Sequence, residues 1–225
     1  MAVTNAQPFD SRREILKMLN NLKVKLLDII DRDFKGSPKL RSYVLERIKN
    51  AKSIIQDLDL RLRDISSHGI EGYRIVFVSS EYLEKGGEKT IVVRKLTGGI
   101  AVIRVGAPVE KSIHIVEISK WRLKCTCPDA VFLSAKADKV LTNILKQNIE
   151  PLMYKYVLCK HTLAGLSILL TLGALKIEDP ILTETIWLSL LSAYLRIADS
   201  KDIESNKSVL MKGLKILEKR TYVKI

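Results

Sequence analysis

The 225-residue sequence lacks the short motifs that build most nucleotide-binding and metal-dependent active sites. It contains no GxxxxGK(S/T) loop, no GxGxxG after a strand and no HExxH pair. Two of its three histidines, His68 and His114, have no convincing nucleophile or carboxylate partner in the sequence. Paired carboxylates such as Asp57 and Asp59 are most simply surface charges on a helix. These absences predict that the protein is not an enzyme.

The sequence also lacks a long apolar segment. Its most apolar run, residues 162–175, is shorter than the roughly 20 residues that span a bilayer, so it predicts a buried helix instead. The first residues, Met-Ala-Val-Thr-Asn-Ala-Gln-Pro, do not combine a basic region with an apolar stretch as a secretory signal does. We therefore expect a cytoplasmic protein with no membrane partner.

The composition is that of a folded protein with a strong positive charge. Hydrophobic residues make up 47% of the chain and charged residues 28%, and the length suffices for one large domain or two small ones. Lysine and arginine total 38 against 25 acidic residues, which gives a net charge of +13. Such an excess favours a polyanion or an acidic protein surface as partner. It is spread along the chain, which suits one basic face and equally a generally basic composition.

All three cysteines lie in one pattern with the third histidine: Cys125-Thr-Cys127 and, after a long spacer, Cys159-Lys-His161. Zn²⁺ takes four N or S ligands in a tetrahedron, and two ligand pairs on two segments can close that shell. The alternative is that the cysteines are buried small hydrophobic residues and that His161 is an ordinary helix residue. Since no cysteine is left outside the pattern, we predict one structural zinc, with no open position for water.

Residues 10–33 and 38–66 predict two long helices joined by a short loop. Ser11-Arg-Arg-Glu14 is a capping box, and Ser37-Pro38 provides an N-cap followed by proline at the first helical position. Apolar residues recur at steps of three and four in both helices: Ile15, Leu19, Leu22, Leu26 and Ile29, then Leu40, Val44, Ile48, Ala51, Ile55, Leu58, Leu62 and Ile65. We predict an antiparallel hairpin that packs on itself, or one whose seam stays partly open to grip another helix.

The periodicity changes to that of β-strands over residues 73–123. Segments 73–79, 90–96, 98–105 and 112–123 are rich in β-branched residues and are separated by Gly-Gly, Thr-Gly-Gly and Ala-Pro breaks. We predict three or four antiparallel strands in a meander, with the last strand leading into the first cysteine pair.

The spacer between the ligand pairs predicts an inserted helix over residues 134–148. Its lysines, including Lys136 and Lys139, are either a solvated face or phosphate contacts. An extended piece then approaches the second ligand pair, and its Tyr154 and Tyr156 are more simply core residues than base-stacking residues.

Three helices are expected after the second ligand pair, over residues 162–175, 179–198 and 202–220. The first is apolar on nearly all sides, which places it in the core. Cys159 and His161 lie at its first turn, where the positive end of the helix dipole favours a thiolate.

Two segments resemble the halves of a SWIM zinc finger, whose pattern is CxC, a variable spacer, then CxH opening a helix. They are Cys-Thr-Cys-Pro-Asp at residues 125–129 and Cys-Lys-His-Thr-Leu-Ala-Gly at residues 159–165. In that family the first pair follows a β-hairpin and the second begins a hydrophobic helix. The spacer here, residues 128–158, is longer than usual, and the resemblance covers only about residues 98–175. SWIM proteins are implicated in DNA binding and protein interaction, and some are partners of RecA-like recombinase paralogues in homologous recombination.

Together these patterns predict an α+β protein in three parts. A long N-terminal helical hairpin (1–70) precedes a SWIM-type domain with an antiparallel β-meander and a Cys3His zinc site (71–175), and a C-terminal helical bundle follows (176–225). The resemblance implies a non-catalytic adaptor in DNA repair or homologous recombination, with DNA and a RecA-like paralogue as partners.

The cations nearest the finger would contact phosphate: Lys120, Arg122, Lys124, Lys136, Lys139, Lys155 and Lys160. One alternative is a protein-interaction scaffold or a homo-oligomer formed through the N-terminal helices, without nucleic-acid contact. The other is an enzyme with zinc as Lewis acid, which would lack the fourth protein ligand.

Overall fold

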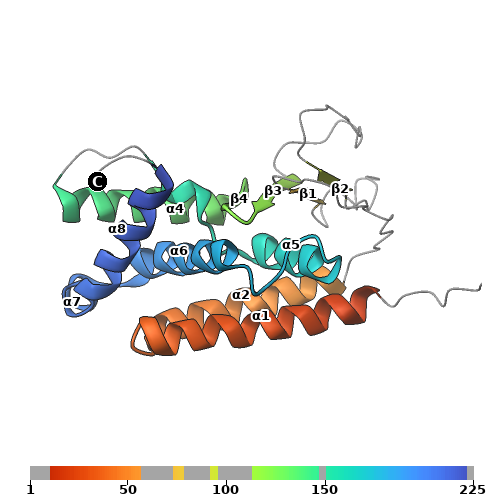
Figure 1. Cartoon of the computed structure of the whole chain (residues 1–225), viewed down its shortest axis with the longest axis horizontal. Coiled ribbons are helices and arrows are strands. Elements are labelled where there is room, and N and C mark those ends of the chain that lie inside the picture. Colours follow the sequence, from red (N-terminus) through yellow and green to blue (C-terminus); the bar gives the residue numbers. More distant parts are fainter. Residues whose placement is uncertain (1–10, 57–72, 79–91, 96–112, 147–150, 222–225) are drawn as a thin grey trace, which may run out of the picture.

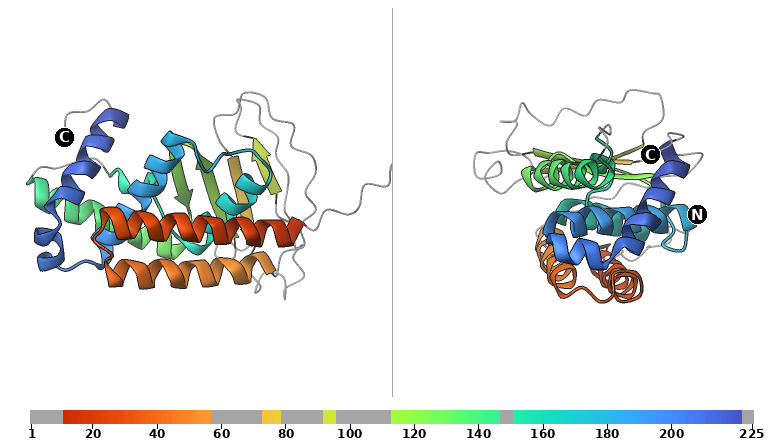
Figure 2. Two further views of the ribbon diagram at one scale, coloured as in Figure 1. Left: turned by 60° about the horizontal axis from the view of Figure 1, so that its bottom comes forward. Right: turned by 90° about the vertical axis from the view of Figure 1, so that its left-hand side faces the viewer.

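The computed structural model describes residues 11–56, 73–78, 92–95, 113–146 and 151–221 (Figure 1). The elements are α1 (Ser11–Asp33), α2 (Pro38–Gln56), β1 (Tyr73–Val78), β2 (Val92–Lys95), β3 (Ile113–Ser119), β4 (Arg122–Cys125), α4 (Pro128–Leu145), η2 (Met153–Lys155), α5 (Lys160–Thr171), α6 (Pro180–Ile197), α7 (Ser200–Ser205) and α8 (Lys207–Thr221). They form three layers: α1 with α2, then α5 with α6, then the sheet with α4 (Figure 2).

Helices α1 and α2 form the expected hairpin, and the loop between them turns at Lys35 and Gly36, both of which have positive φ. Helix α2 is described as far as Gln56, so the predicted continuation over residues 57–66 lies outside the described residues. The seam residues of the described helices are buried: Ile15, Leu19, Leu22, Leu26, Ile29, Leu40, Val44, Ile48, Ala51 and Ile55. Helix α5 packs on both α1 and α2. The seam is therefore covered by another helix of the same chain.

Helices α5 and α6 form the middle layer and are apolar on nearly all sides because both of their faces are covered. In α5, every residue from His161 to Leu170 is buried. The helix ends at Thr171, earlier than expected, because Gly173 adopts the left-handed conformation with φ +67°. The N–H groups of Gly173 and Ala174 then bond back to the carbonyls of Leu170 and Leu169, which satisfies the last turn.

The sheet has four antiparallel strands in the order β2-β1-β3-β4. The predicted meander is wrong, because β1 lies between β2 and β3. The prediction of one strand over residues 112–123 is wrong too, because this segment forms a hairpin of β3 and β4. Its turn is fixed by Ser119, whose hydroxyl accepts a hydrogen bond from the Trp121 N–H (3.1 Å). The predicted strand over residues 98–105 lies outside the described residues.

The expected final helix over residues 202–220 is broken into α7 and α8 at Asn206. The Asn206 side chain is buried and donates hydrogen bonds to the Tyr194 hydroxyl (2.9 Å) and the Asp202 carbonyl (3.1 Å). An asparagine that competes for a helix carbonyl in this way offers the backbone an alternative to the next helical turn. Helix α8 therefore starts in a new direction and packs against α6.

The fold class is α+β, as predicted, and one cluster of buried hydrophobic side chains joins the layers, from Ile15 in α1 to Leu217 in α8. The division of the chain at residues 70 and 175 stays a prediction. Among the described helices, none is both long enough and apolar enough to span a membrane.

Candidate metal centre and the surface beside it

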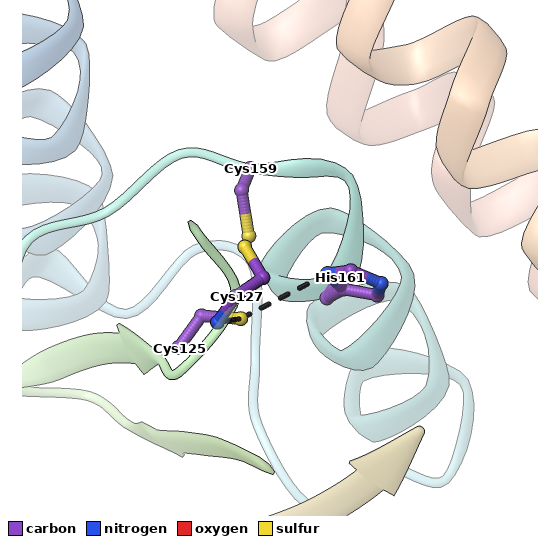
Figure 3. A group of neighbouring side chains, drawn as sticks. All are labelled: Cys125, Cys127, Cys159 and His161. Atoms are coloured by element: carbon purple, nitrogen blue, oxygen red, sulfur yellow. Dashed lines mark hydrogen bonds between the residues drawn. The ribbon is translucent and has the colours of Figure 1, made fainter. Parts of the chain in front are cut away.

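The four predicted ligands converge where the sheet meets the ends of two helices (Figure 3). Cys125 ends β4, Cys127 immediately precedes α4, Cys159 immediately precedes α5, and His161 lies in the first turn of α5. Their ligand atoms all lie within 4.8 Å of one another, and all but Cys125 are buried. Ligand atoms around a tetrahedral zinc are about 3.4–3.8 Å apart, so the farthest pair would need to approach by about 1 Å. This group could therefore hold a metal ion.

Two of the ligand cysteines are also the N-caps of helices. The Cys127 sulfur accepts a hydrogen bond from the N–H of Ala130 (3.4 Å), and the Cys159 sulfur accepts one from the N–H of Thr162 (3.5 Å). The predicted start of the inserted helix at residue 134 is wrong for this reason, because Cys127 caps the helix and Pro128 occupies its first position. Two helix N-termini therefore direct N–H groups at the sulfurs, which favours negative charge on them.

The surroundings of the three thiols shift their pKa values in different directions. A hydrogen bond from Cys125 lowers the pKa of Cys127 far below its usual value, and the same bond raises the pKa of Cys125. Burial raises the pKa of Cys159 to about 12. A metal ion that binds here therefore displaces protons from thiols, as binding to Cys-rich sites requires.

The backbone that presents Cys159 is fixed by hydrogen bonds from two side chains. The Thr162 hydroxyl accepts from the Cys159 N–H (3.0 Å) and donates to the Val157 carbonyl (3.0 Å), which completes a capping box. The Tyr43 hydroxyl of α2 donates to the Leu158 carbonyl (3.0 Å). The second ligand pair is thus fixed to both its own helix and the hairpin layer.

Asp129, beside the centre, has a structural role that the sequence pattern does not predict. It follows Cys127-Pro128 in the first turn of α4, and its Oδ1 accepts from Arg47 of α2 (2.9 Å) and from Arg196 of α6 (2.9 Å). The sequence signal was an acidic residue in the first turn of a helix, which the helix dipole favours. Its two arginine partners are distant in sequence and could not be identified without the fold.

The sequence offers His114 no convincing partner, yet its ring lies 4.5 Å from that of His161, centroid to centroid. It lies two residues before Val116, which pairs with Cys125 in the register of β3 and β4. Burial lowers the pKa of His114, and the neighbouring His161 lowers it further. A neutral imidazole beside the centre adds no positive charge where a cation would bind.

Four of the seven predicted phosphate-contacting cations lie together beside the centre. Arg122 and Lys124 are on β4, Lys120 is in the turn before β4, and Lys155 is in η2, which lies next to β4 through the bridge between Leu123 and Tyr156. Arg122 and Lys124 pair loosely with Glu117 of β3, at 3.9 and 3.8 Å. Lys136 and Lys139 are exposed on α4, and Lys160 is exposed at the start of α5. The structure thus groups four of these cations around β4, whereas Lys136 and Lys139 lie on α4 and Lys160 lies at the start of α5 between two of the candidate ligands.

Exposed aromatic rings accompany the grouped cations. Tyr156 is a core residue, as expected, but Tyr154 is 40% exposed, so its assignment to the core is wrong. The Lys124 ammonium lies 4.8 Å from the centre of the Tyr154 ring, and the Lys155 ammonium lies 5.6 Å from it. Trp121, which the sequence analysis gave no role, is 49% exposed at the turn before β4.

The inserted helix α4 also exposes apolar side chains. Val131 is 56% exposed and Phe132 is 71% exposed, whereas Leu133 and Ala137 on the opposite face are buried. Helix α4 packs on α6 with the buried face. The exposed face is the apolar start of a helix whose later turns carry Lys136 and Lys139.

Comparisons with protein-family models, with curated proteins and with solved structures gave no match.

Proposed function

We propose that the protein is a non-catalytic zinc-binding adaptor that contacts DNA and acts in DNA repair or homologous recombination, beside a RecA-like paralogue. The observation that carries the proposal is the set of three sulfurs and one imidazole within 4.8 Å at the junction of sheet and helices, with all but Cys125 buried. Cys125, Cys127, Cys159 and His161 would hold one Zn²⁺, which in such a site supplies folding free energy and no chemistry. The RecA-like partner rests on the SWIM resemblance of the two ligand segments.

DNA contact is supported by the grouping of Lys120, Arg122, Lys124 and Lys155 around β4. Glu117 is the acidic side chain that pairs with two of them, so the group has a net positive charge. Clustered cations on one face neutralise phosphates, release counterions and make binding salt-dependent.

Metal analysis tests the first half of the proposal. We expect purified protein to contain one equivalent of zinc, and Cys159→Ser and His161→Ala variants to lose zinc together with thermal stability. Zinc that stays bound in His161→Ala without a loss of stability would indicate an open, three-ligand site and would contradict a structural role.

A salt titration tests the second half. The affinity for a DNA duplex, measured by fluorescence anisotropy, should fall linearly on a log–log scale as salt rises. Reversing Lys124 and Lys155 to Glu should weaken binding, whereas the matched reversal of Lys49 and Lys52 should not. Both control lysines are exposed on α2, in the layer farthest from the sheet. Equal loss in both double variants would indicate non-specific attraction to net charge and would contradict the interface.

A second candidate, a protein-interaction scaffold, is favoured by the exposed Val131 and Phe132 on α4. Substituting Phe132→Ser should remove a protein partner captured from the native cell while leaving zinc and DNA binding intact. Deleting the N-terminal hairpin is not a useful test, because its seam residues belong to the core.

A further inference from the structure

A second basic feature lies between α1, α6 and α8. It is a groove of about 560 Å³ lined by Arg32, Glu184, Trp187, Lys212, Lys215 and Lys219, among others. Lys212, Lys215 and Lys219 are exposed and follow one another at steps of three and four along α8, so they share one face of the helix.

The acidic groups at this groove are already paired within the protein. Asp33 accepts from the Trp187 indole N–H (3.0 Å) and pairs with Arg32 (3.1 Å) and Lys212 (3.0 Å). Glu184 pairs with Arg220 (3.1 Å). The remaining charge along the α8 wall is positive, which suits an extended anion more than a neutral ligand.

Arg220 connects this groove to the surface beside the metal centre. It is next to Lys219, and its side chain is 6% exposed. Its guanidinium donates to Thr185 Oγ1 (2.7 Å) and to the Trp121 carbonyl (3.4 Å), and it lies 5.6 Å from the centre of the Trp121 ring. Trp121 therefore lies beyond Lys219, at the end of the line that the exposed α8 lysines form.

Two exposed aromatic rings alternate with cations beyond that point. The Trp121 ring has Lys120 at 5.6 Å on its own turn, and the Tyr154 ring has Lys124 at 4.8 Å. Lys124 is three residues beyond Trp121 along β4, which is roughly 10 Å of strand. The cations restrain the orientation of both rings, while about half of each side chain stays exposed.

We propose that this path, from Lys215 along α8 to Trp121 and then Tyr154, binds single-stranded nucleic acid. The lysines of α8 contact successive phosphates, and unpaired bases stack on the two rings, as stacking platforms in basic grooves do. In a duplex the faces of the bases are stacked on one another, so a duplex can interact with the cations but not with the two rings. An acidic peptide has no base that could stack on them. The inference deepens the proposed function and rests on it, because both require nucleic acid as the ligand.

The test measures binding of labelled oligothymidylate and of a DNA duplex of equal length to the zinc-loaded chain at one salt concentration. Wild type should bind the single strand at least about tenfold more tightly than the duplex. Trp121→Ala and Tyr154→Ala should each weaken single-strand binding about tenfold and leave duplex binding unchanged, given about 1–3 kcal/mol per stacked base. Trp121→Phe should retain most of the affinity because it keeps an aromatic face.

The groove is tested by reversing Lys215 and Lys219 to Glu, with the Lys49 and Lys52 reversal as the charge-matched control. The groove variant should reduce the salt slope for the single strand by about 1–2, while the control should not change it. A second readout is tryptophan emission, which oligothymidylate should quench in wild type and not in Trp121→Phe; the other tryptophan, Trp187, lines the groove and is present in both proteins.

The outcomes separate the two proposals. Equal binding of single strand and duplex, with Trp121→Ala and Tyr154→Ala unchanged, overturns the single-strand path while DNA binding by the β4 cations stands. No salt-sensitive binding of either nucleic acid overturns both. In a third outcome, polyglutamate displaces oligothymidylate at equal charge concentration and does so equally well in Trp121→Ala and Tyr154→Ala. That result assigns the path to an acidic partner and overturns the inference.

Discussion

At the scale of single residues, Asp129 joins three helices with one carboxylate oxygen. Arg47 of α2 and Arg196 of α6 both donate to Oδ1 at 2.9 Å, directly after the first ligand pair. Without the carboxylate, two guanidinium groups would face each other in a partly buried site. The residue therefore stabilises the position of the cysteine loop as well as the helices.

Replacing Asp129 by Ala should lower the free energy of unfolding by about 2 kcal/mol, because it leaves two partly buried cations without their shared partner. Urea denaturation of zinc-loaded protein measures this loss. The control is Asp31→Ala, which removes a more exposed ion pair with Arg41 and should cost under about 1 kcal/mol. A loss for Asp129→Ala no greater than the control would contradict the shared role.

Asp33 makes stability depend on pH. Burial alone would raise the pKa of Asp33, but hydrogen bonds from Arg32 and Lys212 outweigh burial and leave that pKa below its usual value. Because the unfolded pKa is about 3.9, this stabilisation is complete above about pH 5 and is lost as pH falls through the lower folded pKa.

Asp33→Asn should therefore be less stable than wild type at pH 7, and the difference in unfolding free energy should shrink as pH falls from about 5 to 3. Urea unfolding in EDTA removes any contribution from metal loss in both proteins. A difference that stays constant or grows on acidification would show that the carboxylate charge is not the source of the stabilisation.

At the scale of elements, two helices begin on cysteine sulfurs. Serine is a poor zinc ligand but a good N-cap, whereas alanine is neither. Cys127→Ser and Cys127→Ala should both lose zinc. In metal-free protein the Ser variant should be more stable than the Ala variant by about 1 kcal/mol, measured by urea denaturation. Equal stability of the two would mean that the capping bond at α4 contributes nothing.

At the scale of the whole molecule, the four candidate metal ligands lie where the sheet meets the helical layers. Cys125 belongs to the sheet, whereas Cys127, Cys159 and His161 belong to the starts of α4 and α5. Removing zinc should therefore loosen β3, β4 and the first turns of α4 and α5, and leave α1 and α2 protected. Hydrogen–deuterium exchange with and without EDTA measures this, and uniform deprotection of α1 and α2 would contradict it.

Much of this architecture could be predicted from local sequence. The ligands form one pattern that uses every cysteine, and the seams of α1 and α2 repeat over many turns. The order of the strands could not be predicted. β1 and β3 pair across a long stretch of chain, and from sequence alone each strand could equally pair with the strand next to it in the chain. The break at Asn206 depends on Tyr194 of another helix, and the start of α4 depends on a cysteine acting as a cap, which sequence rules seldom include.

The bridge between Leu123 and Tyr156 has a consequence for assembly. The Val157 N–H donates to the Leu123 carbonyl (2.9 Å), so the segment after η2 occupies part of the outer edge of β4. Open strand edges invite pairing with other chains, and a covering segment prevents it. The end of the spacer thus covers this part of the edge, and removing residues 156 and 157 would leave it open to pairing with another chain.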